Sequence, residues 1–206
     1  MTGTRSYGDP CGIARALDVV GERWALLIVR ELLYGPKRFS DLRVALGMSP
    51  NVLSQRLAEL EAGLVVERHQ TAGTLYELSD WGHELHPILL QLGRWGARSG
   101  SPSVGTLSVD ALIAALEATF IPQNATGVDA TYELRLSGER FIVIIRDDSI
   151  AITRGAARNP AVVIETDPNT LRELAFGELK VANAPVTIEG DRTRARAFFK
   201  MFVRPR

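Results

Sequence analysis

Apolar residues recur at helical spacing from the start of the chain. Ile13, Leu17 and Val20 share one face of a first helical segment, and a second apolar run follows at residues 26–33. Positions three, four and seven apart lie on the same side of an α-helix, so the pattern predicts two amphipathic helices. Each helix needs a protein surface against which its apolar side can be buried.

A short helix and then a longer, capped helix are expected next. Ser40 precedes a short helical pattern that is closed by Gly47. Ser49 and Pro50 are residue types preferred at the N-cap and in the first turn of a helix. The helix that they open ends at Gly63. Its apolar positions lie at intervals of four and three, at Leu53, Leu57 and Leu60.

A β-hairpin and a last helix complete the first half of the chain. Two short β-prone runs, at residues 64–68 and 74–78, are joined by a loop around Gly73. A helical pattern then extends over residues 80–95, and Pro87 is expected to kink or restart this helix. Its apolar side carries Leu85, Ile88, Leu89, Leu92 and Trp95.

The second half of the chain mixes strands and helices. Residues 141–145 are apolar on both faces of a strand, which predicts burial under two protein layers or beside a hydrophobic cavity. Strands followed by helices that cover a sheet indicate an α+β domain. The expected elements are a helix capped by Ser108, strands at 132–136, 141–145, 150–152, 161–164 and 186–188, and helices at 168–176 and 191–202.

Composition, rather than charge, marks a domain boundary. Residues 96–105 are rich in glycine and serine, include one proline and separate two periodic regions, as a linker does. Two units of about 100 residues are each close to the commonest domain size. We therefore expect an N-terminal domain over residues 1–98, a linker over 99–106 and a C-terminal domain over 107–206.

Charge and cysteine content narrow the class of protein. The 206 residues include 24 basic and 24 acidic side chains and a single cysteine. Zero net charge excludes a uniformly basic nucleic-acid coat, although a local basic patch is compatible with it. One cysteine forms no internal disulfide, and the apolar runs fall far short of the ~20 residues of a membrane span. We therefore expect a cytoplasmic protein with no membrane partner and no signal-peptide core.

The order of elements in the first half is typical of a winged helix-turn-helix. Its capped helix fits a DNA major groove, and burial of the three leucines leaves Asn51, Ser54, Gln55 and Arg56 facing outward. Residues 37–56 contain four basic side chains and one acid, an excess that suits phosphate contacts. Helix-turn-helix geometry also occurs in bundles without a nucleic-acid partner, so a packing role stays open.

Several motifs occur in a fixed order between residues 11 and 96. They are residues 17–24 (LDVVGERW), 35–42 (GPKRFSDL), 53–57 (LSQRL) with Leu60, 63–65 (GLV) and 76–79 (YELS). With them the segment resembles the HxlR family of bacterial winged-helix regulators, relatives of the MarR type. The resemblance implies a homodimer whose helix over residues 49–62 reads the major groove, while the hairpin contacts flanking DNA. It places dimer contacts on the Ile13/Leu17 face and on the Leu85/Leu92/Trp95 face.

Pattern and resemblance together predict an interface with a near-palindromic, double-stranded DNA operator. The connection from Val66 to Tyr76 is shorter and less basic than many family wings, so Arg68 and His69 are weaker candidates than the helix residues. The predicted DNA-binding residues are Lys37, Arg38, Arg43, Ser49, Pro50, Asn51, Ser54, Gln55, Arg56, Arg68 and His69.

The C-terminal half carries a second, less specific set of motifs. These are residues 159–164 (NPAVVI), 171–177 (LRELAFG) and 186–191 (VTIEGD), before a final helix with Ala197 and Phe198. With them residues 107–203 resemble a sterol-carrier-protein-2-like domain, an α/β sandwich in which a lipid tunnel lies between sheet and helices in many members. The alternative is that large apolar groups here only fill the core. The candidate ligand-pocket residues are Phe120, Phe141, Val143, Phe176, Phe198 and Phe202.

Other reactive residues give weaker signals. Cys11 precedes the first helix, where the helix dipole favours a thiolate. This arrangement resembles that of some HxlR-like regulators, which use such a cysteine to sense oxidants or electrophiles, so Cys11 is a candidate redox sensor. The alternative is that Cys11 is a small buried hydrophobe. His83 and His86 lie three residues apart, but zinc needs further ligands and the remaining histidine, His69, lies in the wing. We therefore predict no metal site and no cofactor.

The expected function is that of a homodimeric transcriptional regulator with an apolar small-molecule effector in its C-terminal domain. No nucleophile elbow, phosphate loop or dinucleotide-binding glycine pattern is present, so we predict no catalytic residues and no enzyme activity. Two alternatives stay open: a lipid-binding or transfer protein whose N-terminal half is an interaction scaffold, and an enzyme that uses Cys11. A basic C-terminal cluster would contact DNA phosphates, an acidic lipid head group or only solvent: Arg192, Arg194, Arg196, Lys200, Arg204 and Arg206.

Overall fold

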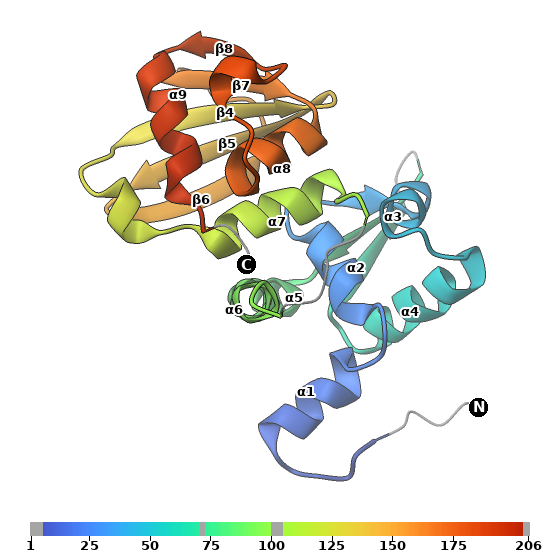
Figure 1. The fold of residues 1–206 in the computed structure, drawn as a ribbon. Coiled ribbons are helices and arrows are strands. Elements are labelled where there is room, and N and C mark those ends of the chain that lie inside the picture. The colour runs from blue at the N-terminus through green and yellow to red at the C-terminus, as the bar shows by residue number, and fades with distance from the viewer. Residues whose placement is uncertain (1–5, 71–72, 100–104, 204–206) are drawn as a thin grey trace. The chain divides into compact units, whose positions relative to one another are not determined.

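Two units make up the chain in the computed structural model, which describes residues 6–70, 73–99 and 105–203 (Figure 1). They divide between Leu89 and Leu90, inside helix α6 (Leu85–Gly96), so the second half of this helix is grouped with the C-terminal unit. Residues 100–104 of the expected linker lie outside the described ranges. The domain boundaries drawn from composition therefore stay predictions.

The N-terminal unit has the element order of a winged helix-turn-helix (Figure 1). Its three strands form an antiparallel sheet in the order β1-β3-β2. Gly47 turns the chain between the third and fourth helices with a φ of +62°, a left-handed conformation that favours glycine. The elements are α1 (Gly12–Val20), α2 (Ala25–Leu32), β1 (Lys37–Arg38), α3 (Phe39–Leu46), α4 (Pro50–Ala62), β2 (Val66–Gln70), β3 (Thr74–Leu78), α5 (Asp80–His83) and α6.

The core of this unit is built from the apolar faces that the periodicity predicts. Ile28 and Leu32 of α2 and Leu42 of α3 have no exposed surface. The three leucines of α4 are equally buried: Leu53, Leu57 and Leu60 are at most 1% exposed. Full burial of a leucine or isoleucine stabilises a fold by about 1.5–3 kcal/mol, so this layer holds α4 in a fixed orientation.

Two local expectations differ from the structure, whereas the expected restart of the last helix near Pro87 is observed. Strand β1 was not expected; Lys37 and Arg38 pair with β3, and α3 begins directly after them rather than after Ser40. The Arg38 N–H donates to the Asp41 carboxylate at 3.4 Å, which supports this earlier start. The last helix restarts at Leu85, so Pro87 lies in the first turn, where a missing N–H breaks no helical hydrogen bond.

The C-terminal unit is a five-stranded sheet with helices packed on one face (Figure 1). The sheet order is β6-β5-β4-β7-β8, in which β4 and β7 are parallel and the other neighbours antiparallel. The elements are α7 (Val109–Thr119), a 3₁₀ turn (Pro122–Ala125), β4 (Ala130–Leu136), β5 (Glu139–Arg146), β6 (Ser149–Arg154), β7 (Val162–Thr166), α8 (Pro168–Phe176), a 3₁₀ turn (Val181–Asn183), β8 (Thr187–Gly190), α9 (Arg192–Phe198) and a 3₁₀ turn (Phe199–Met201). The final helix is thus shorter than the predicted 191–202.

Side chains cap the start of two helices in this unit, one of them the predicted Ser108. The Ser108 hydroxyl accepts a hydrogen bond from the Ala111 N–H at the start of α7. Asp167 caps α8, and hydrogen bonds from the Thr170 side chain and backbone hold the pKa of the Asp167 carboxyl below its usual value. Such bonds satisfy N–H groups that lack a partner in the first turn of a helix.

Strand β5 is buried on one face only. Phe141, Val143 and Ile145 are fully buried under the helices, whereas Ile142 is half-buried and Ile144 is exposed on the other face. The expectation that residues 141–145 are buried on both faces is therefore wrong. The reason is the layer order, because the helices cover a single side of the sheet.

An ion pair between the buried Asp110 and the partly exposed Arg154 fastens α7 to β6. The guanidinium of Arg154 lies 2.6 Å from the carboxylate of Asp110, which is fully buried, and it stacks over the Phe141 ring with its carbon 4.6 Å from the ring centroid. Glu139 forms a further ion pair with Arg154.

In the described part of the chain, no helix is long and apolar enough to cross a membrane.

Candidate nucleic-acid interface

Helix α4 presents a polar face opposite its buried leucines. Asn51, Ser54 and Gln55 are exposed, as the spacing predicts, and Ser49 precedes the first helical residue with an extended backbone. Asn51 and Gln55 are four residues apart and therefore lie on one side of the helix. Asparagine and glutamine side chains can pair with adenine through two hydrogen bonds, so this face can distinguish base edges in a major groove.

Arg56 differs from its neighbours because it is already paired. Its guanidinium contacts the Glu59 carboxylate and lies 3.4 Å from Glu22, and its side chain is only 14% exposed. Glu59 also accepts a hydrogen bond of 3.0 Å from the Gln55 amide. Gln55 must exchange this bond to reach a base, whereas Arg56 holds α4 to the segment before α2.

The basic residues before and on α3 fall into two groups. The Lys37 ammonium lies 3.5 Å from the carboxylate of Glu31, which is fully buried and also accepts a 2.7 Å contact from Arg30. Arg38 and Arg43, in contrast, are exposed. The local positive charge that is available to DNA phosphates is therefore concentrated in these two arginines rather than in all four basic residues of the segment.

The wing hairpin pairs β2 with β3, and its two predicted contact residues differ. Arg68 is exposed. The His69 Nε2 atom lies 2.7 Å from Glu77 and 3.5 Å from Glu67, so its imidazole is directed at these carboxylates. Arg68 is therefore the better candidate for a DNA contact in this hairpin.

The predicted apolar pocket residues of the C-terminal unit lie in or beside its core. Phe198 packs against Tyr132, Phe199 and Phe202 with ring centroids 4.9, 5.4 and 5.1 Å apart. The Phe120 and Phe202 rings are 6.3 Å apart, and Phe141 and Val143 are fully buried. Phe176 is half-buried. This packing favours the core-filling alternative, and the ligand role of these residues stays a prediction.

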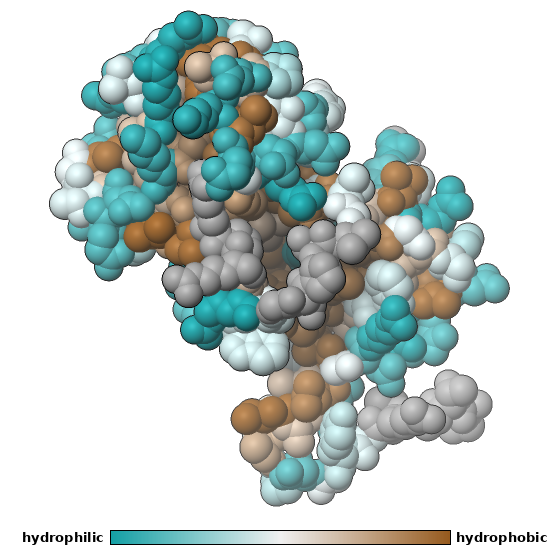
Figure 2. Space-filling view, viewed as in Figure 1, coloured by the Kyte–Doolittle hydropathy of each residue, from teal (hydrophilic) through white to brown (hydrophobic). Residues whose placement is uncertain are grey.

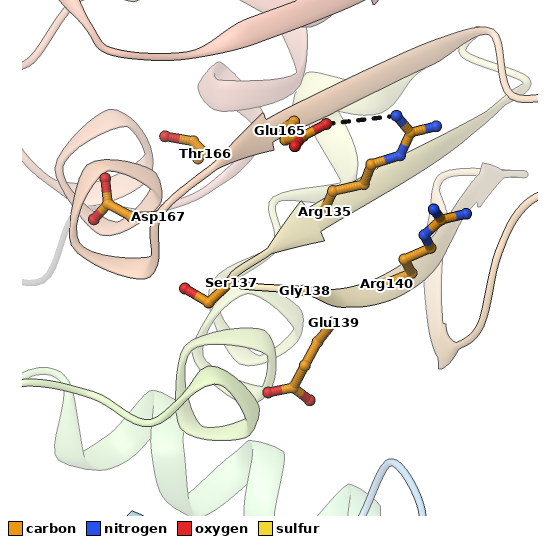
Figure 3. A pocket seen from close by; sticks show the side chains of 8 residues that line it. All are labelled: Arg135, Ser137, Gly138, Glu139, Arg140, Glu165, Thr166 and Asp167. Atoms are coloured by element: carbon orange, nitrogen blue, oxygen red, sulfur yellow. Dashed lines mark hydrogen bonds and ion pairs between the residues drawn. The ribbon is translucent and has the colours of Figure 1, made fainter.

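One pocket of this unit, of about 450 Å³, has a polar lining (Figure 3). It lies where the parallel strands β4 and β7 end, and Arg135 and Arg140 project side by side from neighbouring strands. Arg135 is already held by Glu133 at 2.6 Å and by Glu165 and Glu189 at 3.5 and 3.2 Å. A charged lining does not suit the apolar effector predicted from the sequence. The lining residues are Arg135, Ser137, Gly138, Glu139, Arg140, Glu165, Thr166 and Asp167.

Comparison with known proteins addresses the N-terminal unit. Residues 19–103 match the family model of the HxlR-like helix-turn-helix. The transcriptional regulator YvaP of Bacillus subtilis is 42% identical over 94 residues, which cover 43% of this chain and 87% of YvaP. The chain belongs to the HxlR-like helix-turn-helix family. The relatives of this chain are named as transcriptional regulators of the helix-turn-helix type. This chain is an HxlR-type DNA-binding regulator of transcription.

A second relative and a solved structure are also similar to the HxlR-like domain. The regulator Rv3095 of Mycobacterium tuberculosis is 40% identical over 93 residues, covering 41% of this chain and 56% of that protein. The crystal structure of quinone-bound YodB from B. subtilis aligns with 41% of this chain and 93% of its own, at 32% identity and a TM-score of 0.38. The family match leaves residues 104–206 unassigned, so their resemblance to a sterol-carrier-protein-2-like domain stays a prediction.

Three further residues singled out from the sequence are Cys11, His83 and His86. Cys11 is exposed at the start of α1, and its N–H donates to Asp9 at 2.8 Å, so a sensing role stays a prediction. His83 is exposed, and His86 stacks edge-on against Tyr34. Sequence reasoning missed the cluster of Glu67, His69 and Glu77, although alternating polar residues on one strand face are visible in the pattern.

Lys37 in the HxlR-like domain is expected to act on stability more than on DNA contact. Lys37→Met should lower the free energy of unfolding by about 1–3 kcal/mol, because it removes a cation from a buried carboxylate. Urea denaturation of the full-length protein measures this change. Arg43→Met is the matched control and should change stability by no more than about 0.5 kcal/mol. Equal stability of both variants would contradict the structural role of Lys37.

Proposed function

We propose that the chain acts as a homodimer that recognises a near-palindromic operator through α4. The observation that carries this proposal is the exposed polar face of Asn51, Ser54 and Gln55 on a helix whose other face is locked into the core of an HxlR-like domain. In a two-fold dimer the two copies of α4 would lie about one DNA turn apart, roughly 34 Å. Family membership favours this function over an interaction scaffold.

Selection of duplexes from a random library, followed by titration of the selected duplex, tests the proposal. The purified full-length protein should enrich an inverted repeat and bind it more tightly than a scrambled duplex of the same composition. Its affinity should fall as salt rises, because phosphate contacts release counterions. Equal affinity for the selected and scrambled duplexes would overturn operator recognition.

Two helices expose apolar faces that support dimerisation. Ile13 and Leu17 of α1 are 73% and 43% exposed, and Figure 2 shows hydrophobic surface over this helix. Helix α6 has no buried residue, and its Leu92 and Trp95 are 45% and 67% exposed. Apolar faces at these positions are what the family resemblance predicts for a dimer, and contiguous apolar patches commonly mark protein interfaces.

Charged substitutions on α1 are expected to dissociate the dimer. Ile13→Asp combined with Leu17→Asp should raise the dimer Kd by at least about 100-fold, since each buried aliphatic side chain contributes about 1.5–3 kcal/mol. Native mass spectrometry and light scattering measure the change. Leu64→Asp is the control, because Leu64 is 72% exposed but lies between α4 and β2. An unchanged dimer in the α1 variant would exclude this face from the interface.

We further propose that the C-terminal unit is a sterol-carrier-protein-2-like domain that either binds an apolar effector or stabilises the dimer. A small sheet with helices on one face supports the first part of this proposal. An effector changes DNA binding only if it binds the competent and incompetent dimers with different affinity. The same native mass spectra decide the second part: a co-purified apolar adduct supports the effector, and a clean dimer mass supports the stabilising role.

A further inference from the structure

Three side chains that can bind metal converge on one face of the wing hairpin. Glu67 and His69 alternate along β2, and Glu77 of β3 lies directly opposite Glu67 in the strand register. One ligand atom of each residue lies within 4.8 Å of the other two. Three ligands bonded to a central zinc ion at about 2.1 Å stand roughly 3.4 Å apart in tetrahedral geometry, so small side-chain rotations suffice to close the site.

Two carboxylates and one imidazole nitrogen face one another in this cluster. Like charges that are directly opposite across two antiparallel strands destabilise the pair, and Glu67 and Glu77 form such a pair. The Nε2 atom of His69 is buried, and within the described part of the wing it makes no hydrogen bond of good geometry although Glu77 lies 2.7 Å away. A bound metal would accept this nitrogen and neutralise both carboxylates.

We propose that Glu67, His69 and Glu77 bind a divalent transition-metal ion, and that the ion strengthens contact between the wing and DNA. One imidazole with two carboxylates suits zinc and similar first-row ions, and three protein ligands leave a coordination position for solvent. The second part rests on the proposed function. In their described residues β2 and β3 carry these two carboxylates against the single cation Arg68, so without metal the carboxylates weaken the phosphate contact that Arg68 offers. A divalent ion reverses the sign of the summed charge of these three side chains.

Zinc titration of the full-length protein tests the site. All proteins carry Cys11→Ser, because Cys11 is an exposed thiol and cysteine thiolates are zinc ligands that would compete in the titration. After chelator treatment, competition with a chromophoric zinc indicator should show one zinc ion per chain. His69→Gln and, separately, Glu67→Gln should each lower the zinc affinity about tenfold or more. His83→Gln removes another exposed histidine and should leave it unchanged. Zinc binding that is absent, or equal in His69→Gln and in the control, would overturn the site.

DNA binding with and without zinc tests the coupling. Zinc should tighten binding of the selected operator duplex by the Cys11→Ser protein, and the increase should disappear in His69→Gln. Circular dichroism of the metal-free proteins confirms that the variants fold, and Glu67→Gln should fold at least as stably because it removes a repulsion. An equal zinc effect in His69→Gln would overturn the coupling. Failure to bind any duplex would overturn the proposed function, while the zinc titration would still decide the metal site.

Discussion

Replacement of Asn51 and Gln55 with alanine is expected to remove most of the preference for operator over scrambled DNA. Both amides are exposed on one side of α4, and each pairing of an amide with adenine contributes about 1–3 kcal/mol of discrimination. The double variant should therefore lose about 2–6 kcal/mol of specificity, provided that both side chains read bases. Fluorescence anisotropy with the selected and scrambled duplexes measures the difference.

The matched control removes two amides far from α4 in the sequence. Gln123→Ala with Asn183→Ala changes exposed side chains of the C-terminal unit and should leave specificity intact. Thermal melting should show that both double variants fold like the parent protein. An Asn51/Gln55 variant that discriminated as well as this control would remove α4 as the recognition helix.

The exposed arginines should give a different signature from the amides. Arg38→Ala and Arg43→Ala should weaken binding to operator and scrambled duplexes alike. Each lost phosphate contact should reduce the slope of log K against log salt by about 0.9. Lys37→Met should leave this slope unchanged when compared at equal folded fraction, because its ammonium lies against Glu31.

Arg154→Met is expected to destabilise the C-terminal unit by about 1–3 kcal/mol, the cost of removing a partner from one buried carboxylate. The substitution leaves the fully buried carboxylate of Asp110 without its arginine and removes the cation from the Phe141 ring. Removal of one partner of a buried ion pair costs more than loss of the whole pair, since the remaining charge stays desolvated. Urea denaturation monitored by circular dichroism measures the loss.

Two controls separate burial of the charge from loss of an arginine. Arg146 forms an exposed ion pair with Asp129, so Arg146→Met should change stability by no more than about 1 kcal/mol. Asp110→Asn combined with Arg154→Met should recover part of the stability, because the desolvated charge is gone. A cost for Arg154→Met that matched the cost for Arg146→Met would show that the pair of Asp110 and Arg154 does not anchor α7.

Much of the DNA-binding domain could be predicted because its signals are local. Ser49, Pro50 and the leucine spacing of α4 depend on residues within a few turns of each other, and they specify both the start of the helix and its buried face. The exposure of Asn51, Ser54 and Gln55 follows directly from that spacing. Boundaries that depend on distant partners were less accurate, as with β1, which exists because β3 lies beside it.

The ion-pair partners of the charged residues in the candidate site could be assigned only from the tertiary structure. A count of residues 37–56 treats their basic side chains as equivalent, yet Glu31 and Glu22, which lie outside that window, pair with Lys37 and Arg56. Strand pairing likewise places Glu77 opposite Glu67 and beside His69, although the two glutamates lie ten positions apart in the chain. Such pairs join distant segments, so composition does not reveal them.

The sequence by itself determined the helix-turn-helix, its family and the face of α4 that points away from the core, because periodicity and capping act over short distances. Only the tertiary structure decided which cations stay available to DNA, which apolar side chains are exposed, and that one face of β5 is exposed. Those properties depend on what each side chain meets after the chain folds. Burial sets the free-energy cost of removing a charge from water, and the distance to a partner sets the energy of the interaction between two charges.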